Sequence, residues 1–452
     1  MTAPPIIPVN AFSKRFHHFR KLPLDVIDFI LFLPAICLVC ALGIVLRLIG
    51  PLFIVIPVGF CLLYATLRRT VPPGLLSVYL AFCAFIAILS KYQLLPTSWQ
   101  VHFMQESIVR QLTPLLGYFA TVWASKAYFR RRLLSGNVFA GGRVLLVLSL
   151  VVAPTLMFLQ GAEYQGQDPE LTVVTSFGSL INNNLVALFF VFGGIFLTRD
   201  WRHYLGLVFV LSVAATTHFT QFKILAFVAL VTVFGAPGRI AAIAVVIAMP
   251  VTYAIKMRDI PAAMIENPNS GIRLAFVADA VSSAIDTNGI GVGYGKESVR
   301  WRYEFANMPA FTFLPDPMSM TPERMLEALS TGVENSFAEA LMRTGMPGFL
   351  LFVAAFFVGF PPRNLPRNVR NHAAMLFSMT FIGCFVNSAL ESPISAVGHA
   401  FVFGYLLALR ANARGSVVRA TTQQTLITAT RLSTRFVPLP QVSKRGSAIL
   451  TR

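Results

Sequence analysis

Charged residues are scarce in this sequence: only 12% of its 452 residues are Asp, Glu, Lys or Arg, whereas 56% are hydrophobic. A soluble domain has about 25% charged and roughly 45–50% apolar residues. The mean hydropathy of +0.68 points in the same direction. This composition excludes an ordinary soluble enzyme. It also excludes an intrinsically disordered chain, which needs low hydrophobicity and high charge. It indicates an integral membrane protein.

Cysteine is rare as well, with five residues. All five lie inside apolar runs, and the Cys37–Cys40 pair has no second pair and no nearby histidine. The pattern predicts small apolar side chains within helices. It excludes a disulfide-rich secreted domain and a cysteine-based zinc site.

Long apolar runs, by contrast, recur along the chain. A helix needs about 20 apolar residues to cross a bilayer, and a backbone in lipid must bond within its own segment. The sequence therefore predicts an all-α, polytopic membrane protein with about twelve transmembrane helices. The expected spans are 27–46, 50–67, 73–90, 111–128, 144–160, 175–198, 203–217, 221–236, 239–255, 347–361, 373–389 and 396–410.

The basic residues set the orientation of these spans. The formal net charge is +18, and Lys and Arg concentrate at both termini and in alternate loops. The tail 411–452 has seven of them and no acid, and we expect it to be disordered. The positive-inside rule then places both termini in the cytoplasm. The excess charge is explained by topology and by contact with membrane lipid, so nucleic acid is not expected as a partner.

One loop is much longer than the others. Residues 257–346 contain 11 of the 19 acidic residues and are expected on the external face, as a large, partly helical periplasmic loop. No internal repeat is visible, which argues against transporters built from duplicated halves. The predicted organisation is a basic N-terminus 1–26, nine spans in 27–256, the external segment 257–346, three spans in 347–410 and the tail 411–452.

Local signals predict structure inside the external segment. An apolar-periodic helix is expected from Ser270-Gly271 to Asn288-Gly289, which provide a left-handed cap. The following Gly289-Ile-Gly-Val-Gly-Tyr-Gly295 lacks the spacing and context of a nucleotide-binding loop and predicts a structural turn that could line a site. Thr321-Pro322 predicts another helix start. A last helix is expected from Asn335 to Arg343, ending at Gly345.

Two acids in that last stretch differ in their surroundings. Glu339 precedes Arg343 by four residues, so the sequence predicts an ion pair on one helix face. Glu334 precedes the helix and has no such local partner. Asn335 can cap the helix or orient a substrate.

Polar residues at membrane depth are further candidates. Asn182, Asn183 and Asn184 lie within one expected span, and Lys223 opens another. The asparagines can simply join helices by hydrogen bonds, and the lysine can simply extend toward the headgroups. These structural roles remain open as alternatives to a role in a functional site.

The order of these features resembles the O-antigen polymerase and ligase superfamily of membrane glycosyltransferases. Four stretches are similar to family patterns: INNNLVALFF (181–190), FTQFKILAF (219–227), SGIRLAFVADAVSSAIDTNGIGVGYG (270–295) and ENSFAEALMRTGMPG (334–348). Together with the spans they cover most of residues 27–410. The chain looks most like exopolysaccharide polymerases of the xanthan or acetan type.

The resemblance implies a polymerase in the bacterial inner membrane that uses undecaprenyl-pyrophosphate-linked repeat units as donor and acceptor. A chain-length regulator or copolymerase and a flippase are the protein partners it implies. The leaving pyrophosphate needs cations, for which Arg273 and Lys223 are the first candidates, with Arg343, Arg300 and Arg302 behind them. Glu334 is the expected proton acceptor, with Glu339 as runner-up. Asn335 and Asn183 are expected to contact substrate.

The aspartates lack an Asp-x-Asp spacing, and cationic side chains can replace a metal at the leaving group. We therefore expect no metal and no cofactor. One position departs from the family pattern, because Glu334 stands where ligases and many polymerases have histidine, which leaves open a polymerase that uses a carboxylate or a different base. This favours a polymerase over a ligase. A lipid-linked oligosaccharide flippase and a non-catalytic assembly subunit are the alternatives from other classes.

Overall fold

The structure is a computed structural model. It describes residues 28, 55–96, 103–105, 108–135, 189, 191–198, 204–205, 207–208, 236–260, 262, 268–298, 335–386, 396 and 398–413.

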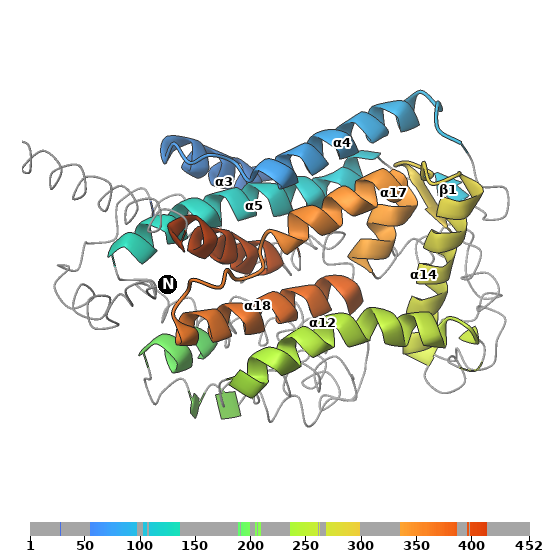
Figure 1. The fold of residues 1–452 in the computed structure, drawn as a ribbon. Coiled ribbons are helices and arrows are strands. Elements are labelled where there is room, and N and C mark those ends of the chain that lie inside the picture. Colours follow the sequence, from blue (N-terminus) through green and yellow to red (C-terminus); the bar gives the residue numbers. More distant parts are fainter. Residues whose placement is uncertain are drawn as a thin grey trace, which may run out of the picture.

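Nearly all of the described chain is helical. The helices are α3 (Val55–Leu67), α4 (Gly74–Lys91), α5 (Ile108–Ser135), α12 (Ala236–Lys256), α14 (Pro268–Asp286), α17 (Ser336–Phe357) and α18 (Arg367–Val386), a π-helical turn η4 (Gly194–Thr198), and a final helix over 398–413. In Figure 1, α14 lies across one end of the other long helices. The all-α prediction is confirmed for the described residues, apart from one short ribbon.

That ribbon joins two segments far apart in the chain. Strand β1 (Phe103–Gln105) pairs antiparallel with β2 (Lys296–Ser298), and Met104 lies opposite Glu297. The sequence gives no alternating pattern over three residues, so this pairing was not predicted. It ties the loop between α4 and α5 to the segment that follows α14.

The expected spans 50–67, 73–90, 111–128, 239–255, 347–361, 373–389 and 396–410 coincide wholly or mostly with described helices. By length and composition alone, two of the described helices, α4 and α17, could cross a membrane, although α17 is interrupted at Gly345. The expected spans 27–46, 144–160, 175–198, 203–217 and 221–236 lie wholly or mostly outside the described residues.

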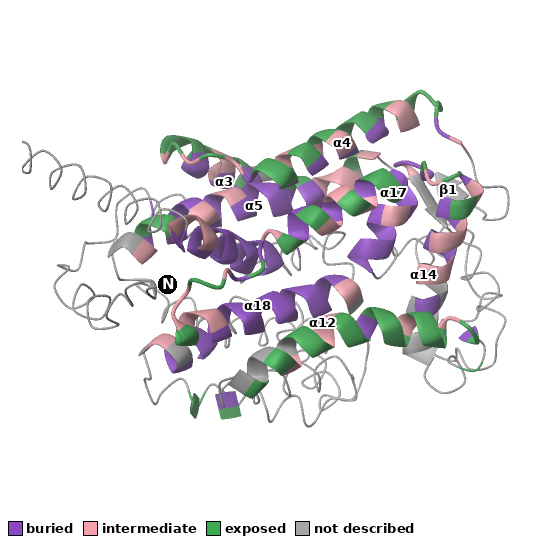
Figure 2. Cartoon of the chain, in the orientation of Figure 1, coloured by how far each residue is buried: buried purple, intermediate pink, exposed green. Residues whose placement is uncertain are grey.

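Helix α4 shows what kind of solvent this chain requires. One face buries Leu76, Tyr79 and Cys83 against the protein. The opposite face exposes Phe85 and Ile88, each more than half accessible. A helix that is apolar on every side suits lipid rather than water. Figure 2 shows exposed positions along the outer side of α4 and of α12.

A cluster of phenylalanine rings forms the centre of the core. Phe337, at the start of α17, has its ring centroid 5.1 Å from that of Phe352, 5.5 Å from that of Phe356 and 5.3 Å from that of Phe381 in α18. Aromatic rings at these separations contribute beyond the area they bury. The cluster fixes the beginning of α17 against its own end and against α18.

These contacts require α17 to fold back on itself. In a straight helix, Phe337 and Phe356 would be separated by about 28 Å along the axis. The reversal occurs at Gly345, whose φ of 65° and ψ of −168° are not helical. Residues 336–344 therefore form a separate helix, which confirms its predicted end at Gly345. They lie beside residues 346–357 rather than in line with them.

Residues 289–295, here called the glycine strap, pack across this reversal. All four glycines of the strap have φ between 78° and 87°, as the alternation predicts for a turn. The backbone N–H groups of Val292 and Gly293 donate to the carbonyls of Met342 and Arg343, at 2.8 and 3.0 Å. The strap thus satisfies carbonyls that the helix 336–344 leaves unpaired at its end.

The strap also contacts two other helices. The N–H of Tyr294 donates to the Ser90 hydroxyl of α4 at 2.8 Å, and the N–H of Gly295 donates to the Gln111 side-chain oxygen of α5 at 2.6 Å. These hydrogen bonds hold α4 and α5 against the strap and therefore close to α17. They join residues that are about two hundred positions apart in the chain.

At the other end of α3 and α5, a buried carboxylate joins several cations. Asp28 accepts hydrogen bonds from Tyr64 at 2.6 Å, from Arg68 at 2.7 Å and from Arg132 at 3.0 Å. Its side chain is only 5% exposed, so the charge is stable there because it is paired and hydrogen-bonded. The network joins the N-terminal part of the chain to the loop after α3 and to the end of α5.

Candidate active site

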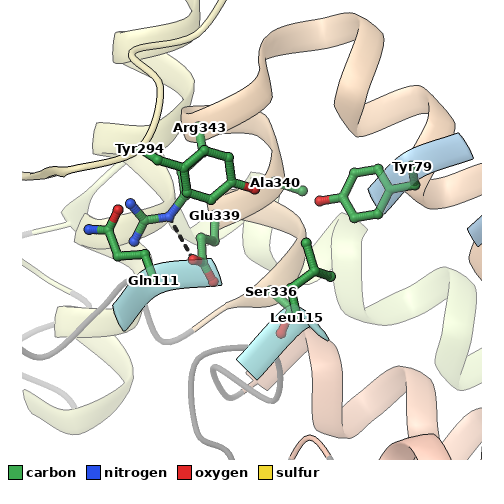
Figure 3. A pocket seen from close by; sticks show the side chains of 8 residues that line it. All are labelled: Tyr79, Gln111, Leu115, Tyr294, Ser336, Glu339, Ala340 and Arg343. Atoms are coloured by element: carbon green, nitrogen blue, oxygen red, sulfur yellow. Dashed lines mark hydrogen bonds and ion pairs between the residues drawn. The ribbon is translucent and has the colours of Figure 1, made fainter. Parts of the chain in front are cut away.

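The candidate site is a small cavity where α4, α5, α17 and the glycine strap meet. Its volume is about 20 Å³, which suits one water molecule or one small polar group. Figure 3 shows the side chains around it. They are Tyr79, Gln111, Leu115, Tyr294, Ser336, Glu339, Ala340 and Arg343.

A buried ion pair forms one wall of the cavity. The Arg343 Nε donates to Glu339 Oε1 at 2.6 Å, and the two side chains are 2% and 9% exposed. The guanidinium carbon of Arg343 also lies 5.6 Å from the centre of the Tyr294 ring, within range of a cation–π contact. The ion pair predicted from the four-residue spacing is therefore confirmed, and both of its members line the cavity.

Helix capping brings this ion pair to the cavity. The Asn335 side chain accepts from the N–H groups of Phe337 and Ala338 at 3.0 and 2.9 Å, and so begins the helix. Ser336, Glu339 and Arg343 then follow at spacings of three and four residues, on one face. Asn335 is 2% exposed and caps the helix, which was one of its two predicted roles.

The tyrosine hydroxyls come from two different parts of the chain. Tyr79 lies on α4 and Tyr294 on the glycine strap, and both side chains line the cavity and are buried. Burial raises the pKa of the Tyr294 hydroxyl well above its ordinary value. Tyr294 is therefore neutral at physiological pH and available as a hydrogen-bonding group rather than as a base.

The side chains of the other predicted site residues lie outside the described part of the chain. Arg273 lies in α14, which packs against α17, but its side chain is outside the described residues. Five further predicted residues lie outside the described residues with their backbone as well: Lys223, Asn183, Arg300, Arg302 and Glu334. Of the predicted set, Asn335, Glu339 and Arg343 are brought together by the structure.

Several cavity residues were not predicted. Tyr79 and Leu115 lie in apolar runs that reveal only a membrane helix. Gln111 is a polar residue at the start of such a run, which is a usable signal for a buried role. Tyr294 lies among the alternating glycines, a stretch that was expected to turn and to line a site.

Comparisons of the chain with protein-family models, with curated proteins and with solved structures gave no match. The resemblance to O-antigen polymerases and ligases therefore depends on the sequence features alone, that is, on the four stretches and on their order among the expected spans.

Proposed function

We propose that this chain is a membrane glycosyltransferase of the bacterial inner membrane that polymerises lipid-linked oligosaccharide repeat units on the external face. The donor is a repeat unit carried on undecaprenyl pyrophosphate, and the acceptor is a sugar hydroxyl of a second lipid-linked unit. A flippase supplies the units, and a chain-length regulator or copolymerase is the expected protein partner.

Composition and helix properties support a place in the membrane. The sequence is 56% hydrophobic, and α4 is long enough to cross a bilayer and apolar on its outward face. The proposal extends this to about twelve crossings with both termini in the cytoplasm, following the distribution of Lys and Arg.

The observation that carries the proposal is the cavity itself. The glycine strap and the first half of α17 both belong to the segment expected outside, and they close a polar cavity against α4 and α5. A hydrophobic chain keeps ionised and hydroxyl groups at such a place mainly for function. An enzyme that joins sugars carried on lipid needs this combination of an external segment and membrane helices.

The proposed reaction is a displacement at the anomeric carbon of the donor sugar. The acceptor oxygen forms a bond to that carbon while the bond from the carbon to the pyrophosphate oxygen breaks. The electron pair leaves with the pyrophosphate. The proton of the acceptor hydroxyl passes to the carboxylate of Glu334, which directly precedes the buried Asn335 in the chain.

The departing diphosphate carries several negative charges and needs cations in a partly dry site. We assign Arg273 and Lys223 to it, with Arg300 and Arg302 behind them. Arg343 is the weaker candidate because Glu339 compensates its charge at 2.6 Å.

Glycan analysis of a deletion strain tests the function. The expected result is the accumulation of single repeat units on lipid, and complementation with the intact gene restores polymer. Complete polymer that fails to reach its final anchor would instead indicate a ligase. Repeat units trapped in the cytoplasm would indicate a flippase, and either finding would contradict the proposal.

A further inference from the structure

We infer that the cavity between α4, α5 and α17 binds an uncharged, hydroxyl-bearing group of a sugar, and that the diphosphate binds elsewhere. This inference depends on the proposed function only in taking that sugar to be part of the acceptor. It adds Tyr79, Gln111 and Tyr294, which the sequence did not identify, as specificity-determining residues of the site.

The charge of the described lining disfavours an anionic group. Among the described residues that line it, Arg343 is the one cation and Glu339 the one acid. They lie 2.6 Å apart and are both buried, so the pair is neutral as a unit. A phosphate placed here would meet the Glu339 carboxylate in a dry environment, where like charges repel strongly.

The lining also excludes a purely apolar group, such as part of the polyprenyl chain. An apolar occupant would lie against the Tyr79 and Tyr294 hydroxyls and the Glu339–Arg343 pair and could form no hydrogen bond with them. Covering polar groups in this way is costly. Tyr79, Tyr294, Glu339 and Arg343 are all buried in the protein, which increases that cost.

A sugar hydroxyl or hydroxymethyl group satisfies the same groups. Such a group both donates and accepts, and tyrosine hydroxyls, a side-chain amide and a carboxylate offer both functions. Two tyrosine rings provide flat apolar surface beside these polar atoms (Figure 3). The volume of about 20 Å³ admits one substituent of a sugar ring and not the whole ring. The cavity therefore recognises the substituent at one position of the sugar ring.

Binding of methyl glycosides tests this assignment independently of polymer formation. The full chain is placed in nanodiscs, and saturation-transfer NMR measures the affinity for methyl glucoside, methyl galactoside and methyl mannoside. Tyr79→Phe and Tyr294→Phe each remove one hydroxyl and keep the ring. Tyr118→Phe is the matched control, because Tyr118 is buried in α5 but does not line the cavity.

We expect at least one glycoside to bind wild type and Tyr118→Phe equally, and to bind Tyr79→Phe or Tyr294→Phe about 3- to 10-fold more weakly, the loss of one neutral hydrogen bond. Inorganic pyrophosphate should not displace it. The inference is overturned if no glycoside binds, if pyrophosphate competes, or if all three variants behave alike. Failure of the polymerase proposal would be seen separately, in the glycans of the deletion strain.

Discussion

Gly345→Ala is expected to prevent stable folding of the site, at a cost of about 3 kcal/mol or more. The φ of 65° with ψ of −168° at Gly345 lies in a region that is essentially restricted to glycine. A methyl group there would also collide with the backbone of Gly289 and Ile290, which cannot move aside without breaking the strap. Both effects act at the point where α17 reverses, so the Glu339–Arg343 pair would lose its position.

Thermal unfolding of the purified full chain in detergent measures this effect. Gly59→Ala is the matched control, because Gly59 lies in α3 and a methyl group there would meet nothing within 4 Å. Replacing glycine by alanine in a helix interior stabilises by roughly 0.5–1 kcal/mol. The two substitutions should therefore have opposite signs. Equal unfolding temperatures for Gly345→Ala and wild type would show that the reversal at Gly345 is not required.

Loss of the proton acceptor or of the phosphate-binding cations should nearly abolish polymer synthesis. Glu334→Gln keeps the size of the side chain but removes the base, and should lower the rate at least about 10²-fold. Arg273→Ala and Lys223→Ala remove cations that stabilise the leaving group, with a cost of similar order. The measurement is polymer formed by the deletion strain carrying each variant, at equal protein level.

Arg258→Ala is the control for these variants, because Arg258 is an exposed cation beyond the end of α12. It should leave polymer synthesis unchanged. Normal polymer from both Arg273→Ala and Lys223→Ala would refute their assignment to the diphosphate. If Glu334→Gln were nearly normal while Glu339→Gln were inactive, the roles of the two acids would be exchanged.

Helices were the easiest part of this structure to predict. Apolar runs of about 20 residues have few alternatives in lipid, so the positions of α4, α12 and α18 could be predicted closely. The caps were predictable for local reasons, since Asn335 accepts from the first N–H groups of its own helix, and Asn288 and Gly345 adopt positive φ at helix ends. Which helices pack against each other could not be predicted, because a uniformly apolar run does not indicate which of its faces contacts which helix.

In the site, too, local features could be predicted and contacts between distant segments could not. The Glu339–Arg343 pair follows from a four-residue spacing and was predicted. The contribution of Tyr79 and Gln111 depends on the strap reaching α4 and α5, over more than 180 residues of sequence. No local pattern encodes that contact. The reversal of α17 could not be predicted either, since Gly345 predicts the end of a helix but not the direction in which the next helix runs.

Every role proposed for the site requires residues 257–346 to face away from the cytoplasm. Labelling of single introduced cysteines by a membrane-impermeant maleimide tests this orientation directly. Ile285 in α14 and Val71 in the loop before α4 are both 70% exposed, and the described native cysteines are buried. We expect Ile285→Cys to react in intact spheroplasts and Val71→Cys to react only after lysis. The reverse pattern would contradict the orientation, and with it the role proposed for the site.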